Sequence, residues 1–201
     1  YDDVITVVDD LLKTTETEII PYSTLEKFIS SDDVVYKVYN TNNPGMIFSW
    51  GKLDVDATGF GYDLMRHSKA FFCASSELIG LYDEGNDLRF SRYYDKYDFN
   101  NYDEGIFYVA TKNYCKASTA NEAYDQALRL EEAYLNRAEA YIEKGEYELG
   151  MDDVNAIRAE RIKGEYELVA NSVDEAREFY RLEKRLEFSF EGLRWFDIRR
   201  W

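Results

Sequence analysis

The sequence has 201 residues, of which 45% are hydrophobic and 32% charged, and its formal net charge is −16. This length suffices for one ordinary domain, and the acidic balance argues against a binder of nucleic acid or of membrane surfaces, because contacts with phosphate need a basic face. One histidine, His67, and two distant cysteines, Cys73 and Cys115, exclude the usual zinc spacings and leave no recognisable catalytic triad, so we expect neither a metal site nor a cofactor.

Two helices are predicted at the start of the chain. Residues 3–13 carry valines and leucines at helical spacing, with acidic residues between them. A second, short helix is expected after Pro21, because Ser23 and Glu26 have the spacing of a capping box.

Short strands and a long loop are predicted next. Residues 34–39 and 46–50 are rich in β-prone side chains, and the turn-forming residues 40–45 separate them, which indicates a hairpin or two short strands. Residues 51–69 have the composition of a glycine-rich loop. Loops of this length are uncommon inside a compact domain and are often functional.

A helix over residues 75–84 follows, with a serine cap at its start and Gly85 at its end. Residues 88–116 are rich in tyrosine and are predicted to form strands. The second half of the chain has a different, helical pattern, which begins at Asn121.

The helix that begins at Asn121 is predicted to end at Gly145, and the next begins near Tyr147. Such a short connection makes the two helices antiparallel, and a pair of about thirty-four residues has the size of a tetratricopeptide unit. Ser172 is predicted to cap a last helix that stops at Gly192. The inward face of the second helix of the pair is expected to carry Leu149, Met151, Val154 and Ile157.

The final stretch, residues 183–201, mixes charged and bulky apolar residues more densely than any other part of the chain. Because isolated charges are costly to bury, reciprocal ion pairs are expected here, and a structural role is favoured over an anion site or a set of catalytic carboxylates. The residues of this motif are Glu183, Arg185, Glu187, Glu191, Gly192, Arg194 and Asp197. The expected pairs join its four carboxylates to Arg158, Arg161, Arg185, Arg194 and Arg199.

These residues resemble the C-terminal half of the SusD/RagB family. The resemblance rests on motifs that occur in the family's order, namely residues 76–89, residues 128–140 with Asn155, Arg158 and Arg161, and residues 183–201. It implies a mainly α fold, with tetratricopeptide-like helix pairs and a loop-rich region that carries a few short β-strands. It also implies a single domain over residues 1–201, in which residues 1–120 hold the candidate ligand loops and residues 121–201 hold the helical region and the terminal motif.

The family consists of surface lipoproteins of the outer membrane in Bacteroidota, so the resemblance implies a piece of a longer protein with its lipid anchor in upstream sequence. The implied function is non-enzymatic capture of a glycan or another nutrient for a SusC-like TonB-dependent barrel transporter, with no nucleic-acid partner. The alternative is a tetratricopeptide-type module that binds only another protein.

Glycan recognition needs aromatic rings that stack on sugar C–H faces and polar side chains that bind hydroxyl groups. Family members take part of their ligand contacts from loops before the helix at residue 76, which favours the loop after Trp50. The candidate ligand-binding residues are Trp50, Asp54, Phe60, Tyr62, Arg66 and His67. Packing in the core is the alternative for each of them. The tyrosines between Tyr93 and Tyr102 are a second choice, with strand packing as their alternative.

Overall fold

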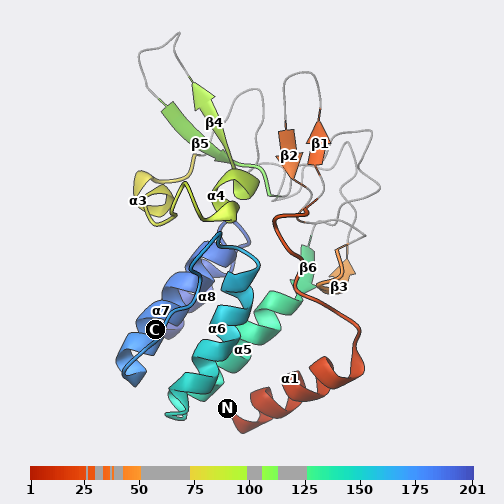
Figure 1. Ribbon diagram of the computed structural model, residues 1–201, viewed down its shortest axis with the longest axis vertical. Coiled ribbons are helices and arrows are strands. Elements are labelled where there is room, and N and C mark those ends of the chain that lie inside the picture. Colours follow the sequence, from red (N-terminus) through yellow and green to blue (C-terminus); the bar gives the residue numbers. More distant parts are fainter. Residues whose placement is uncertain are drawn as a thin grey trace. The chain divides into compact units, whose positions relative to one another are not determined.

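A computed structural model describes residues 1–25, 27–29, 34–36, 38, 43–50, 73–98, 106–112 and 126–201 (Figure 1). The chain forms two compact units. Unit 1 consists of Tyr1–Pro21, Pro44–Phe48 and Leu128–Trp201, and unit 2 consists of Tyr22–Asn43 and Ser49–Ala127. The single domain with a division at residue 120 stays a prediction.

Unit 1 is helical, as the sequence predicts. Its helices are α1 (Asp2–Thr14), α5 (Leu130–Glu143), α6 (Tyr147–Ala159), α7 (Val173–Glu187) and α8 (Arg194–Arg200). Helix α5 packs against α1, α6 and α7 (Figure 1). Gly145 has φ +85°, a left-handed conformation that lets the chain reverse between α5 and α6 within three residues. The antiparallel pair and its glycine turn are thereby confirmed.

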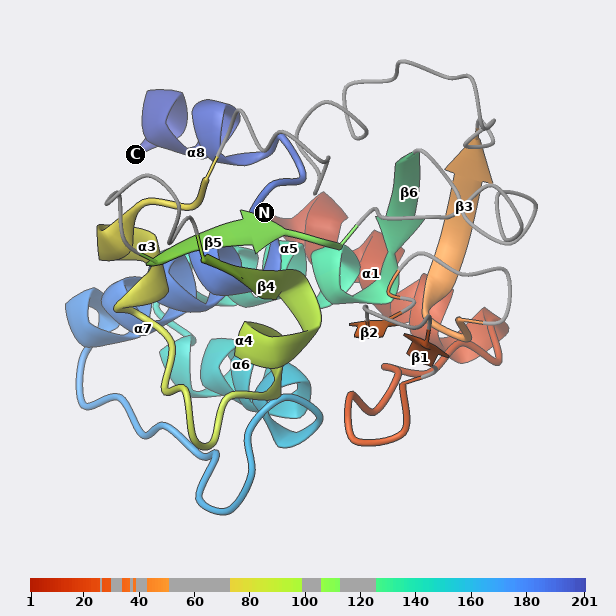
Figure 2. The ribbon, with the colours of Figure 1, turned by 90° about the horizontal axis from the view of Figure 1, so that it is seen from above.

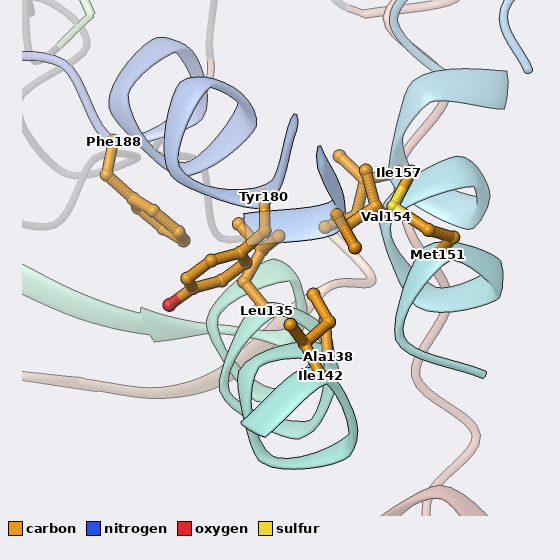
Figure 3. Packing of buried hydrophobic residues seen from close by; sticks show 9 residues of the cluster. Leu135, Ala138, Ile142, Met151, Val154, Ile157, Tyr180 and Phe188 are labelled. Atoms are coloured by element: carbon orange, nitrogen blue, oxygen red, sulfur yellow. The ribbon is translucent and has the colours of Figure 1, made fainter. Parts of the chain in front are cut away.

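The core of unit 1 lies between α5, α6 and α7. Figure 3 shows Tyr180 of α7 reaching toward Leu135 of α5, with Val154 of α6 beside them. The buried members of this cluster are Leu135, Ala138, Ile142, Met151, Val154, Ile157, Ala176, Tyr180 and Phe188. Leu149 was expected to face inward with Met151, but its side chain is 46% exposed. The inward stripe of α6 is therefore narrower than the apolar pattern suggests.

Gly150 allows α5 and α6 to approach closely. A Cβ atom at this position would lie 2.6 Å from Cγ1 of Ile142 and 2.8 Å from the carbonyl oxygen of Ala138. Real Cβ atoms do not tolerate such distances, so the two helices can keep this spacing only with glycine here.

The connector between α6 and α7 is held by side chains of α6. The Asn155 amide donates to the carbonyl of Leu168 and accepts from the N–H of Leu168, both at 2.9 Å. Arg158 donates to the carbonyl of Tyr166 at 2.6 Å. The connector ends at Ser172, whose hydroxyl accepts from the N–H of Glu175 at 3.2 Å and caps α7, as predicted.

Helix α1 is attached to α5 by charged side chains. Arg137 of α5 donates to Asp9 of α1 at 2.6 Å and to Asp153 of α6 at 2.6 Å and 2.9 Å. Lys144 donates to Asp2 at 2.6 Å. One face of α1 is thus fixed to the helix pair, in agreement with the helix predicted over residues 3–13.

The described strands form three two-stranded sheets. Strand β1 (Lys27–Ile29) pairs antiparallel with β2 (Val34–Tyr36), and Phe28 lies opposite Val35. The second short helix predicted after Pro21 is therefore wrong, because residues 27–29 gain backbone hydrogen bonds from β2 that override their local helical signal. Of the two alternatives predicted for residues 34–39 and 46–50, the structure has the two short strands, because residues 34–36 pair with β1 and not with residues 46–50.

Two further pairs of strands are present. Strand β3 (Met46–Trp50) pairs with β6 (Gln126–Arg129), and Leu130 donates its N–H to Gly45 at 2.7 Å. The long helix predicted from Asn121 thus begins only at Leu130. Strand β4 (Tyr94–Asp98) pairs antiparallel with β5 (Ile106–Ala110), and the two lie side by side in Figure 2.

Two short helices of unit 2 differ from the prediction. Helix α3 (Ser76–Ile79) has the predicted serine cap, because the Ser75 hydroxyl accepts from the N–H of Leu78, but it ends at Gly80 and not at Gly85. Helix α4 (Leu88–Tyr93) occupies the start of the segment that was predicted to form strands. The Asp87 carboxylate caps α4, and this local hydrogen bond favours a helix there.

Candidate functional site

Of the ligand-binding residues predicted from the sequence, only Trp50 lies within the part of the chain that the structure describes. Trp50 is the last residue of β3, but only its backbone is described. The other five, Asp54, Phe60, Tyr62, Arg66 and His67, fall among residues 51–72, which lie outside the described ranges. They stay predictions.

Of the second choice, the tyrosines between Tyr93 and Tyr102, the structure describes the side chains of Tyr93 and Tyr94, and both are buried. Tyr93 and Tyr94 are 1% and 5% exposed. The Tyr93 ring stands edge-on to that of Tyr22, with hydroxyl oxygens 2.7 Å apart, and the Tyr94 ring stands edge-on to that of Tyr82. These rings form the aromatic core of unit 2 together with Phe90. Tyr93 and Tyr94 therefore follow the packing alternative and offer no free face to a sugar.

An ion pair in the segment 76–89 fixes the start of α4. Arg89 donates from Nε to Oδ1 of Asp87 at 2.9 Å and from its terminal nitrogen to Oδ2 at 2.9 Å. Both side chains are buried, at 0% and 3% exposure. This two-point contact is the strong form of a guanidinium–carboxylate pair, and it joins Asp87, the N-cap of α4, to Arg89 in the first turn of the helix.

The densest group of charges in unit 1 surrounds Arg161, directly after α6. Its guanidinium donates to Glu131 of α5, to Glu187 of α7 at 3.1 Å, and to the carbonyl of Ile20 at 2.8 Å. Arg161, Glu131 and Glu187 are completely buried. One arginine thus joins three segments that are distant in the sequence.

Arg129, at the end of β6, is the second cation of this group, and the sequence did not reveal it. It lies 3.1 Å from Glu131, 3.0 Å from Glu187 and 2.8 Å from Glu191. We call Arg129, Glu131, Arg161, Glu187 and Glu191 the buried charge cluster. The sequence signal that could have revealed Arg129 is the pair of charges at 129 and 131 on either side of Leu130. Charges next to a buried leucine are costly to bury alone, so they imply an ion-pair partner from another segment.

The remaining motif residues lie around α7 and α8. Glu183 pairs with Arg158 at 3.1 Å. Asp197 lies 3.1 Å from Lys184 and 3.6 Å from Arg200, and neither of these cations is among the five arginines expected to pair with the motif. Gly192 has φ +80°, a left-handed conformation that glycine adopts readily. However, α7 already ends at Glu187, so Gly192 lies in the connection to α8 and not at the predicted end of the helix. The other two motif residues, Arg185 and Arg194, are half-buried and exposed respectively.

The buried charge cluster connects residues of β6, α5 and α7 with Arg161 after α6. Each carboxylate faces a guanidinium at ion-pair distance and is occupied by this partner, whereas catalysis needs a carboxylate open to substrate. Burial raises the pKa of the neighbouring Glu132 above its ordinary value, and the carboxylate of Glu191 adds to this shift. No group of histidine, cysteine and acidic side chains that could hold a metal is found among the described residues.

Comparison with known proteins identifies the family. The sequence model of the SusD family matches residues 34–201. The chain belongs to the SusD family.

Solved structures agree with this assignment at the level of the fold. The SusD-family chain is similar to a SusD-like carbohydrate binding protein from Bacteroides vulgatus, with a TM-score of 0.66 and 17% identity over 94% of this chain and 39% of that one. It is also similar to a SusD superfamily protein from the same species, with a TM-score of 0.61 and 16% identity over 98% of this chain and 47% of that one.

This SusD-family chain therefore spans less than half the length of either structural relative. A search among curated proteins finds no match. None of the helices in the described ranges is long and apolar enough to cross a membrane.

Proposed function

We propose that this SusD-family chain takes part in capturing glycans at the cell surface, without catalysing a reaction. The observation that carries the proposal is the match of residues 34–201 to the SusD family. The structural relative described as a carbohydrate binding protein supports the same ligand class. The net charge of −16 is compatible with this, because neutral sugars bind through stacking and hydroxyl contacts and need no basic site.

The proposed recognition uses residues that begin where β3 ends. Trp50, Phe60 and Tyr62 offer aromatic faces for sugar rings, and Asp54, Arg66 and His67 offer donors and acceptors for hydroxyl groups. The burial of Tyr93 and Tyr94 supports this choice over those two tyrosines. Binding of this kind needs no cofactor, no metal and no chemical step.

The same proposal includes a place and a partner. The protein acts on the outer-membrane surface, where a lipid anchor in upstream sequence holds it. There it passes its ligand to a SusC-like TonB-dependent barrel transporter. The ligand class extends to other nutrients, and nucleic acid is not among the partners.

Isothermal titration calorimetry against a panel of soluble glycans tests the proposal. We expect saturable binding to at least one glycan and its loss in Trp50→Ala and Tyr62→Ala. Tyr166→Ala is the matched control, since Tyr166 is a 39% exposed tyrosine in the connector between α6 and α7. Binding that survives both loop substitutions but is lost in the control would contradict the choice of residues.

Two further measurements distinguish between classes of function. Incubation with the same panel should release no reducing sugar, and hydrolysis would show an enzyme. The alternative is a tetratricopeptide-type module for protein–protein interaction, which the antiparallel pair α5–α6 favours. Tight binding to a barrel transporter with no response to any glycan would select this alternative.

A further inference from the structure

The connector between α6 and α7 contains an extended run. Gly164 has φ +83°, a left-handed conformation that turns the chain before this run begins. Within the run, Leu168 donates its N–H to the side-chain amide of Asn155 and accepts from the same amide with its carbonyl, both at 2.9 Å. For one amide to reach both groups, they must point to the same side, as they do in an extended residue. Leu168 therefore has a strand-like conformation, with its hydrogen-bonding side toward α6.

The outer edge of this run exposes backbone groups. In an extended chain the backbone groups of alternate residues point to opposite sides, so those of Glu167 and Val169 point away from α6. The carbonyl of Tyr166, which accepts from Arg158 at 2.6 Å, lies on the inner side with Leu168, as this alternation requires. Within the described ranges, the N–H and C=O groups of Glu167 and Val169 make no hydrogen bond. Four backbone groups are thus open to a further strand.

The side chains at this edge define the chemistry of a partner. In an extended run, the side chains of Glu165, Glu167 and Val169 point to one face. Both glutamates are exposed, and neither has an ion-pair partner in the part of the chain that the structure describes. Val169 is 70% exposed. Lysine or arginine opposite the two glutamates, with an apolar residue opposite Val169, would complement this face.

Two other occupants fit this edge less well. A second copy of the chain would bring its own Glu165 and Glu167 to the same edge, and each copy has a net charge of −16. A further strand of the same polypeptide would cover the edge permanently. Charged side chains on an edge strand, however, protect edges that stay in water from pairing with the wrong strand. The two carboxylates therefore favour a basic partner that comes from a separate protein.

We propose that residues 165–170 form an edge to which an extended, basic segment of a separate protein adds as an antiparallel strand. Hydrogen bonds to the backbone of Glu167 and Val169 provide affinity, and the side-chain pairs provide specificity. In the antiparallel direction, the segment carries an apolar residue followed two and four positions later by lysine or arginine. None of residues 165–170 is among the proposed glycan-binding residues, so the two proposals are independent.

A selection experiment tests the proposal. A displayed library of short random peptides is selected on the immobilised chain, and we expect enriched peptides that carry the basic pattern. Glu167→Pro removes one outward N–H and leaves the hydrogen bonds of Leu168 to Asn155 in place. It should therefore lower the affinity of the selected peptides by about tenfold or more in fluorescence anisotropy. N-methylation of a selected peptide should abolish binding only at alternate residues, because only these point their N–H groups to the edge.

Charge reversal tests the chemistry of the partner. The double substitution Glu165→Lys and Glu167→Lys should lower the affinity of the selected peptides by about tenfold or more and should select acidic peptides in their place. The matched control is Asp152→Lys with Glu178→Lys, which changes the net charge equally at exposed positions on α6 and α7. It should bind the selected peptides as the original chain does, and every variant should keep its melting temperature.

Four results would overturn the proposal. They are a library without enrichment, selected peptides that bind Glu167→Pro equally well, self-association in sedimentation that Glu167→Pro abolishes, and selected peptides that bind this chain but not the full natural protein. The last two would show that a second copy, or the protein's own polypeptide, covers the edge.

Discussion

Arg161 and Glu187 form an ion pair in which Nε lies 3.1 Å from the carboxylate and neither side chain has any exposure to solvent. The pair ties the end of α6 to α7, and Glu131 brings α5 into the same contact. Removal of one charge from such a buried pair is strongly destabilising, because water does not reach the partner to replace the lost contact.

Glu187→Gln should therefore destabilise the chain strongly. The substitution leaves Arg129 and Arg161 in place, with one carboxylate fewer between them. We expect a loss of about 3–5 kcal/mol in the free energy of unfolding, measured by urea denaturation. The control is Asp10→Asn, which breaks the exposed pair of Asp10 with Lys13 and should leave stability unchanged. Equal effects of the two substitutions would show that the cluster does not hold the helices.

The pKa of Glu132 leads to a prediction about pH. Burial raises this pKa above the ordinary value of 4.5, so the folded chain holds the proton more tightly than the unfolded chain. The stability that this provides is present at low pH and is lost as the pH rises above 4.5 through the folded-state pKa. Glu132→Gln should thus raise the melting temperature at pH 7, and the gain should shrink as the pH falls below 4.5, where the acid becomes protonated in both states.

Glu148→Gln is the comparison for this experiment, because Glu148 is exposed on α6. It should change the melting temperature little at either pH. A stabilisation by Glu132→Gln that persists undiminished at low pH would disprove the electrostatic explanation.

Gly150→Ala tests the close approach of α5 and α6. In an isolated helix, alanine is more favourable than glycine by about 1 kcal/mol. The added Cβ, however, would lie 2.6 Å from Ile142 and 2.8 Å from the backbone of Ala138, so overpacking should outweigh that gain. We expect a net destabilisation of about 1–3 kcal/mol by thermal denaturation. A comparison of Asp152→Ala with Asp152→Gly, at an exposed position of the same helix, measures the propensity difference alone.

Arg89→Lys tests the geometry of the buried pair with Asp87. Lysine keeps the charge but cannot make the two parallel hydrogen bonds that Arg89 makes at 2.9 Å each. We expect a loss of about 1–3 kcal/mol in the free energy of unfolding. Arg199→Lys, at an exposed position, should be neutral. If both substitutions were neutral, stability would depend on the positive charge at residue 89 and not on the planar geometry of the guanidinium group.

The helical half of the fold was predictable because its signals are local. Gly145 and Ser172 mark a helix end and a helix start, and the structure has both. The strand β1 was not predictable in this way. Ser23 and Glu26 have the spacing of a helix start. Residues 27–29 nevertheless form a strand, because they pair with β2. Helix α8 was missed because Gly192 reads as an end, and because the apolar residues after it do not face the core.

The partners of Arg129 could not be predicted from position alone. Glu187 and Glu191 are 58 and 62 residues away in the sequence, so no local spacing connects them. The acids of the C-terminal motif were recognisable from their density, whereas the charges flanking Leu130 indicate only that Arg129 needs a partner and not which residue this partner is. The predicted ligand residues after Trp50 rest on composition and family resemblance, and the glycan titration is their test.

The side-chain amide of Asn155 both donates to and accepts from Leu168, and these two bonds should slow local opening of the chain at this residue. It gives Leu168 the two hydrogen bonds that a neighbouring strand would give, although the residue lies in a connector without regular structure. The Leu168 amide should therefore exchange its hydrogen for deuterium as slowly as amides in α6, and Asn155→Ala should speed this exchange selectively. Through one side chain, the connector becomes part of the same cooperative unit as the helix before it.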